Sequence, residues 1–265
     1  MLHEIAMQTA PEEEVLKAEL RAEREQLSKN QNRIKDAGLP VMVVFEGWGA
    51  AGKGSIIGKV IKNIDPRFFR VSTMEKKPSE EEKRYPFLYR YLLKIPEAGK
   101  FAFFDTYWME EVVQESMLGH LNEEQYRKRI DCINRTERSL HDNGYLILKF
   151  FFQISKKEQK RRLKALEEDN DHYDDYFEVY DRFLEDTNRS VAPWYVIDSS
   201  DKKWAELQVL HFLNQGIETA LQNQALAAPI LQNVFPLVPM PKLSDISLDD
   251  KTMTDEEYDE ELKEL

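Results

Sequence analysis

The sequence predicts an α/β fold in which a mostly parallel sheet is covered by helices on both faces. Two observations support this: five apolar strand candidates alternate with helical segments, and the first candidate runs directly into a glycine-rich loop and another helix. Neighbouring parallel strands need a long crossover connection, which a helix supplies. The strand candidates are residues 41–45, 70–73, 101–104, 145–152 and 194–197. We expect ligands at the carboxyl ends of these strands.

The first 36 residues are predicted to form an amphipathic helix that precedes the main domain. Between about Glu12 and Lys35 the sequence is highly charged, and its apolar residues lie at helical spacing. Gly38 and Pro40 end the helical pattern before the first strand. We interpret this helix as a strut against the core, with a partner-binding helix as the alternative.

Residues 45–55, FEGWGAAGKGS, are typical of a phosphate-binding loop. A sharp turn through several glycines points backbone N–H groups at an anion, and a lysine adds a positive charge. The stretch matches G-x-x-x-x-G-K-[ST] except for one extra glycine after the lysine. The alternative is a glycine-rich turn with a solvated lysine, which the flanking strand and helix disfavour. The residues expected to bind phosphate here are Gly47, Gly49, Gly52, Lys53, Gly54 and Ser55.

Further helices are predicted between the later strands, at residues 56–64, 80–94, 108–118 and 123–141. The interval 156–190 is helical and strongly polar, and it lies where kinases with such a loop carry a lid that closes over phosphates. We predict a helical lid over about 156–190. Its basic first half, 156–162, is a candidate polyanion surface, whereas the acidic stretch 167–175 is interpreted as ordinary solvated surface.

A phosphate-binding loop that transfers phosphoryl groups needs Mg²⁺, whose carboxylate ligand usually comes from the end of a neighbouring strand. Asp105 follows the apolar strand 101–104 and is our candidate for that ligand, with a cap for the helix near Trp108 as the alternative. Glu46 and Glu115 are further candidates, each with a surface or structural carboxylate as the favoured alternative. The five histidines show no ligand spacing, so no zinc site is predicted.

The charge balance argues against a general polyanion-binding surface. The chain has 37 Lys and Arg residues and 49 Asp and Glu residues, which gives a formal net charge of -12 at pH 7. We therefore expect no DNA or RNA partner and no membrane partner. Cys132 is the only cysteine, and no run approaches the ~18 apolar residues of a membrane span. We expect a cytoplasmic protein.

With these motifs placed, the chain resembles the polyphosphate kinase 2 family from about residue 12 to residue 221. The matching stretches are EGWGAAGKGS, DPRFFRV, the block from KKPSEEE to YRYLLKIPEAGKFAFFD, ISKKEQKRR and APW at 192–194. The resemblance implies an adenylate-kinase-like, three-layer α/β/α domain over 37–226 with a five-stranded sheet and a helical lid. It further implies Mg²⁺-dependent transfer of phosphate between inorganic polyphosphate and AMP or ADP, and a homo-oligomer.

The resemblance also assigns roles to individual residues. It implies that Lys53 contacts the transferring phosphates, that Asp105 helps to hold Mg²⁺, and that Glu115 matches an acidic residue of the following helix. Arg67 and Arg90 stand where the family has arginine. We therefore expect Lys53, Asp105 and Arg90 to act in catalysis, Arg67 to bind phosphate, and Asp105 and Glu115 to bind the metal.

Three positions depart from the family pattern. Gly49 stands where the family usually has aspartate, and Thr106 and Glu111 stand where it has arginine. Loss of one charge-assisted contact to a phosphoryl group costs on the order of 100-fold in rate or more. Two hypotheses follow: an active phosphotransferase, or a degenerate module that binds phosphate weakly or scaffolds an active partner domain. An ATP-using nucleoside monophosphate kinase shares the fold but explains neither KKPSEEE nor APW.

The segment 227–265 is predicted to be a proline-rich linker and the start of a C-terminal helix. Four prolines lie between Pro229 and Pro241, and the sequence of 255–265 resembles that of 13–23. Some members of the family carry two such domains in tandem, of which the first is degenerate. We interpret this chain as similar to the first half of that arrangement.

Overall fold

The computed structural model describes residues 2–4, 10–75, 77–166 and 172–226, together with Thr254, Glu256 and Lys263. The chain divides into two units, Met1–Ala225 and Leu226–Leu265. The predicted linker and helix start at 227–265 lie outside the described residues, apart from those three positions. The first unit contains the sheet.

The core of this unit is a five-stranded sheet with the order β2-β3-β1-β4-β5, in which every neighbouring pair is parallel. Each predicted strand is present, and the central strand β1 is buried along its whole length because helices cover both of its faces. The strands are β1 (Val41–Gly47), β2 (Phe69–Thr73), β3 (Phe101–Asp105), β4 (Leu146–Gln153) and β5 (Trp194–Asp198).

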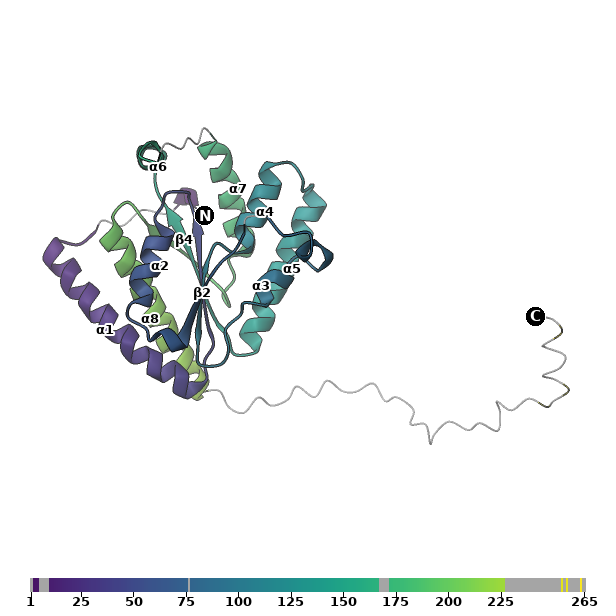
Figure 1. Ribbon diagram of the computed structural model, residues 1–265, viewed down its shortest axis with the longest axis horizontal. Coiled ribbons are helices and arrows are strands. Elements are labelled where there is room, and N and C mark those ends of the chain that lie inside the picture. The colour runs from purple at the N-terminus through teal and green to yellow at the C-terminus, as the bar shows by residue number, and fades with distance from the viewer. Residues whose placement is uncertain are drawn as a thin grey trace. The chain divides into compact units, whose positions relative to one another are not determined.

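Helices form a layer on either side of the sheet. Figure 1 shows α1, α2 and α8 on one side and α3, α4, α5 and α7 on the other, which gives the expected three layers. The helices are α1 (Glu13–Ala37), α2 (Lys53–Ile61), α3 (Tyr89–Leu92), α4 (Trp108–Met117), α5 (Glu123–Asp142), α6 (Lys156–Lys164), α7 (Tyr173–Thr187) and α8 (Lys202–Leu226), with short 3-10 helices η1 (Leu2–Glu4), η2 (Pro66–Phe68) and η3 (Glu82–Arg84). Within the described ranges, no helix is long and apolar enough to cross a membrane.

Helix α1 packs against α8. Its apolar stripe, which includes Leu20, Leu27 and Ile34, is buried, and Asn30 Nδ2 donates a 3.0 Å hydrogen bond to Asn214 Oδ1 of α8. Gly38 ends α1 in the left-handed conformation, with φ of 63°, as the sequence suggested. The predicted role of α1 as a strut agrees with this packing. Helix α8 is not among the helices predicted from the sequence.

The predicted helix over 80–94 is wrong. The structure has two short helices there, η3 and α3, separated by Pro86. Proline lacks a backbone N–H and disfavours helical geometry in the residue before it; Tyr85 accordingly has φ of -109° and ψ of 162°. Arg90 lies in α3, after the break.

The predicted lid at 156–190 consists of two different parts. Helix α6 follows β4 directly and is largely exposed, whereas α7 packs against α4 and α5 with Tyr180, Phe183 and Leu184 buried in the core. The second half of the segment is therefore part of the helical layer in this structure. Movement of the segment at about 156–190 as a lid stays a prediction.

A buried ion pair joins β4 to the helical layer. Lys149 and Glu137 of α5 are both inaccessible to solvent, and Lys149 Nζ lies 2.7 Å from Glu137 Oε2. Lys149 Nζ also donates to Thr187 O at 2.9 Å and lies 4.8 Å from the ring centroid of Trp194. Burial lowers the pKa of Lys149 and raises that of Glu137, and the pair opposes both shifts.

We predict that Lys149→Met alone destabilises the fold by about 3–5 kcal/mol, because it leaves the Glu137 carboxylate buried without its cation. The double variant Lys149→Met with Glu137→Leu should recover most of this loss, since no unpaired charge remains. Urea unfolding followed by circular dichroism measures both values. A single variant within about 1 kcal/mol of the wild type would contradict the prediction.

Candidate active site

The phosphate-binding loop occupies the sharp turn between β1 and α2. Gly47 has φ of 120° and Gly52 has φ of 93°, a region that side chains rarely adopt. A Cβ at Gly47 would lie 2.5 Å from Phe152 O of the neighbouring strand β4. Only glycine fits at this position. The chain therefore leaves the sheet at Gly47, where the sequence predicted the start of the loop.

Helix α2 begins at the loop without a side-chain cap. Its N-cap is Gly52, and within the described chain no acceptor is recorded for the N–H groups of residues 52–55. The first N–H groups of a helix have no partner inside it, and together with the helix dipole they favour an anion. The predicted phosphate residues Gly52, Lys53, Gly54 and Ser55 therefore form a site with anion-binding geometry.

Lys53 and Asp105 flank this helix start. Lys53 Nζ donates hydrogen bonds to Gly47 O at 2.7 Å and Trp48 O at 3.2 Å. Asp105, at the carboxyl end of β3, has its Oδ2 3.6 Å from the position of a Cβ on Gly54. Burial raises the pKa of Asp105, and the charge of Lys53 opposes the shift. The structure thus brings together the lysine and aspartate that the sequence predicted.

Asp105 fits a magnesium site with few protein ligands. Within the described ranges, no three His, Cys, Asp or Glu side chains gather in a way that could hold a metal ion. Mg²⁺ commonly binds one or two carboxylates together with waters and substrate phosphates, so one strand-end carboxylate beside a phosphate site is a suitable donor set. Glu115 Oε2 instead lies 3.2 Å from His120 Nδ1 in an exposed position. Among the described residues, no contact links Glu115 to the loop.

Glu46 connects the loop to the start of α4. Its carboxylate is buried and accepts a 2.6 Å hydrogen bond from the backbone N–H of Tyr107, which is the N-cap of α4. Burial raises the pKa of Glu46 to about 8, and the hydrogen bond opposes the shift. In the structure Glu46 thus bonds the start of a helix, which agrees with the structural alternative to its role as a metal carboxylate.

Arg90 reaches the carboxyl edge of the sheet but is already paired. Its side chain is only 4% exposed; Nη1 lies 3.5 Å from Glu82 Oε2, and Nε lies 3.8 Å from Glu111 Oε2. Nη2 also donates to the backbone carbonyl of Glu75. Glu111 in turn accepts a 2.9 Å hydrogen bond from Tyr91. Two carboxylates of the chain therefore occupy the guanidinium that was expected to meet phosphate.

The structure does not bring Arg67 to the loop. Arg67 lies in η2, before the first residue of β2, and hence at the amino end of the strands, whereas the loop follows their carboxyl end. Its side chain is 81% exposed and forms an ion pair with Asp65 at 2.7 Å. We therefore leave Arg67 out of the site, because the matching sequence motif precedes a strand instead of following one.

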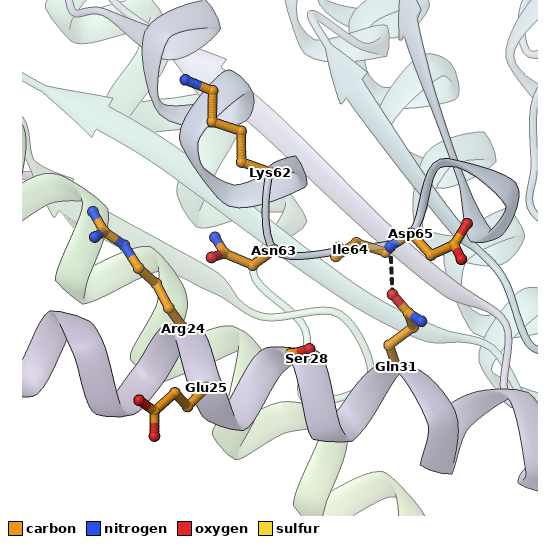
Figure 2. A pocket seen from close by; sticks show the side chains of 8 residues that line it. All are labelled: Arg24, Glu25, Ser28, Gln31, Lys62, Asn63, Ile64 and Asp65. Carbon is orange, nitrogen blue, oxygen red and sulfur yellow. Dashed lines mark hydrogen bonds between the residues drawn. The ribbon is translucent and has the colours of Figure 1, made fainter.

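An open pocket of about 530 Å³ lies beside Asp65, also away from the loop. Figure 2 shows its lining by α1 and by the residues after α2, with Gln31 accepting a hydrogen bond from the Asp65 N–H. The lining mixes two cations, Arg24 and Lys62, with two carboxylates, Glu25 and Asp65. This balance gives no preference for a phosphate.

The three positions that depart from the family pattern have distinct surroundings. No atom lies within 4 Å of a Cβ placed on Gly49, so a side chain fits there. Thr106 has φ of 76°, one of two positive values among described non-glycine residues, and the other, Ala50, lies in the loop. Glu111 holds Arg90, as described above. Backbone strain of this kind is typical of functional sites.

Sequence reasoning missed the residues that hold the loop from the other side. The indole of Trp48 is buried, stacks on Tyr173 of α7 with ring centroids 4.0 Å apart, and donates a 2.7 Å hydrogen bond to Gln153. Arg162 of α6 donates to the carbonyls of Ala50 and Ala51. The only signal for them was an aromatic residue inside a glycine loop and a basic stretch after β4.

We predict a pH dependence from Glu46. The pKa of the Glu46 carboxyl group is about 8 in the folded protein, compared with an ordinary value of 4.5. Between these two pH values the folded state binds more protons than the unfolded state. Its stabilising contribution is therefore present at low pH and is lost as the pH rises toward about 8. Compared with Glu46→Gln, the wild type should lose thermal stability across this range, as measured by calorimetry in buffers of matched ionic strength. Parallel pH profiles for the two proteins would contradict the assignment.

Comparisons with known proteins agree with this geometry. Residues 10–225 match the model of the family described as polyphosphate kinase 2. The chain is 33% identical over 232 residues to a polyphosphate:AMP phosphotransferase of Pseudomonas aeruginosa, covering 80% of this chain and 47% of the relative. It is 30% identical to ADP-polyphosphate phosphotransferase 3 of Rhizobium meliloti, covering 74% of each.

The fold is also shared with solved structures. A crystal structure of polyphosphate kinase 2 from Arthrobacter aurescens aligns with a TM-score of 0.77 and 26% identity, covering 83% of this chain and 85% of that one. The chain spans about half the length of the polyphosphate:AMP phosphotransferases that it matches. The loop, the strand order and these matches agree, and the chain belongs to the polyphosphate kinase 2 family.

Proposed function

We propose that this chain is the phosphate-binding domain of a phosphotransferase that moves phosphate between inorganic polyphosphate and AMP or ADP with Mg²⁺. The observation that carries the proposal is the uncapped start of α2, where Lys53 is the first helical residue and Asp105 lies beside Gly54. The names of the relatives, which include polyphosphate:AMP and ADP-polyphosphate phosphotransferases, support the substrate class.

Each residue of the site has a defined part in this proposal. The N–H groups at the start of α2 bind phosphoryl oxygens, and the ammonium of Lys53 neutralises charge on the transferring group. Asp105 holds Mg²⁺, which when bound supplies further charge neutralisation between the phosphates. Glu46 accepts a hydrogen bond from the backbone N–H of Tyr107 and so holds the start of α4 next to the loop.

The proposal extends to the setting of the domain. The relatives of about twice this length support a second, tandem domain as a partner. We further propose a homo-oligomer in the cytoplasm, without DNA, RNA or membrane partners; the net charge of -12 supports the exclusion of polyanionic partners.

A second candidate function is a catalytically impaired module that binds phosphate or scaffolds an active partner domain. Two observations favour it. Gly49 offers no carboxylate, and Glu82 and Glu111 already neutralise Arg90. The two candidates share the anion site at the start of α2 and differ in whether the chemistry proceeds there.

The first prediction concerns Lys53. Its replacement by alanine should lower the formation of ADP or ATP from polyphosphate, Mg²⁺ and AMP or ADP by about 100-fold or more, because the transferring phosphoryl group loses its cation. Coupled luminescence or ³¹P NMR measures the product, and Lys62→Ala, an exposed lysine beyond α2, serves as the control. Equal turnover by wild type and Lys53→Ala would exclude catalysis at this loop.

The second prediction separates the two candidates. Gly49→Asp introduces a carboxylate into open space, and Glu111→Gln removes one of the carboxylates that neutralise Arg90. If the domain is impaired for these reasons, the double variant should turn over at least about tenfold faster than the wild type.

Glu110→Gln in place of Glu111→Gln is the matched control, because it removes the same charge from the preceding position of α4. A wild type that is already fast, combined with no gain in the double variant, would reject the impaired module.

A further inference from the structure

All five carbonyl groups from residue 47 to residue 51 have a hydrogen-bond donor inside the protein. Lys53 donates to the carbonyls of Gly47 and Trp48. Gln159 makes a long 3.5 Å contact with the carbonyl of Gly49. Arg162 donates to the carbonyls of Ala50 and Ala51, and Ser199 also donates to that of Ala51. The carbonyls of residues 49–51 are thus bonded to α6 and to the loop after β5, whereas the N–H groups of residues 52–55 have no bonded acceptor among the described residues.

Arg162 binds two of these carbonyls and also reaches a second loop. Its Nη1 lies 3.2 Å from Ala50 O and 3.3 Å from Ala51 O, and its Nη2 lies 2.7 Å from Ser199 O and 2.9 Å from Ser200 O. Its Nε donates to Glu158 Oε1 at 2.6 Å. A guanidinium has five N–H donors, and five acceptors surround this one. It therefore joins the phosphate-binding loop to the loop after β5.

We infer that Arg162 is a positioning residue of the phosphate-binding loop: it holds the carbonyl side of the loop against α6 and residues 199–200, so that the N–H side stays directed at phosphate. The inference rests on the proposed function in taking phosphate as the ligand of the loop. It differs from the expectation that the basic stretch of α6 faces a polyanion, because the guanidinium of Arg162 is only 14% exposed and is used up within the protein.

The geometry explains why arginine is needed. A lysine has one ammonium group and cannot span two pairs of carbonyls on separate loops, whereas the planar guanidinium reaches both with its two terminal nitrogens. Removing it leaves the partly buried carbonyls of Ala50 and Ala51 with fewer donors and frees the turn to reorient. Since α6 also carries Gln159, the helix and the loop should move as a unit.

The neighbouring Arg161 provides a matched control. It lies on the same helix, carries the same charge and pairs with the same Glu158, at 2.7 Å, but it is 71% exposed and has no contact with the loop among the described residues. Arg161→Ala therefore removes an equal charge from α6 without touching the carbonyls. Any effect of general electrostatics will appear in both variants.

The first arm of the test needs no ligand. Amide hydrogen exchange in the free protein reports on the loop bonds Trp48 N to Phe152 O and Ala51 N to Trp48 O. Arg162→Ala should speed exchange at these amides by about tenfold or more, leaving the core of β1 unchanged, whereas Arg161→Ala should not. Arg162→Lys should give an intermediate rate of amide exchange, and this variant replaces Arg162→Ala in the test if the alanine variant does not fold. Equal loop exchange in the Arg162 and Arg161 variants would overturn the inference.

The second arm measures tripolyphosphate affinity by calorimetric titration. Arg162→Ala should weaken binding by about 10-fold to 100-fold, the usual effect of losing a residue that orients a binding group, and Arg161→Ala by much less. Faster loop exchange with unchanged affinity would also overturn the inference. If the loop responds in the first arm but the wild type binds no tripolyphosphate, then the proposed function fails while the positioning role of Arg162 stands.

Discussion

The division of the phosphate-binding loop into a bonded carbonyl side and an open N–H side is the constraint on which the rest of the site depends. A tight turn has as many carbonyls as N–H groups, and it attracts an anion only if the carbonyls are directed elsewhere. Here Lys53, Arg162 and Ser199 take the carbonyls. Gly47 makes the turn possible, because only glycine fits against the backbone of Phe152.

The neutralisation of each cation near the site depends on the groups next to it and not on the net charge of the chain. The chain carries a formal charge of -12, so a phosphate site must exist as a small electropositive region within an acidic protein. Lys53 and the start of α2 supply that region. At Arg90 two carboxylates lie close by, with Glu82 Oε2 3.5 Å from Nη1 and Glu111 Oε2 3.8 Å from Nε, and the expected part of Arg90 in catalysis stays a prediction.

Much of the fold could be predicted because the strands are apolar runs of the right length. Each of the five predicted strands is present, and their parallel pairing follows from the helices between them. The failure at residues 80–94 has a local cause: they have helical composition, but Pro86 splits them. Composition describes an average over a segment, whereas a single proline or one buried face decides its structure.

The sequence by itself determined the loop, the lysine and the strand-end aspartate, because their spacing along the chain fixes their place at the carboxyl edge of a parallel sheet. It could not decide the partners of long side chains. Arg67, Arg90 and Arg162 are all arginines in matching motifs, yet the first lies at the far end of the strands, the second is neutralised by carboxylates, and the third holds the loop from behind. Only the tertiary structure separates these cases, since a guanidinium acts through whatever the fold places within hydrogen-bond distance of it.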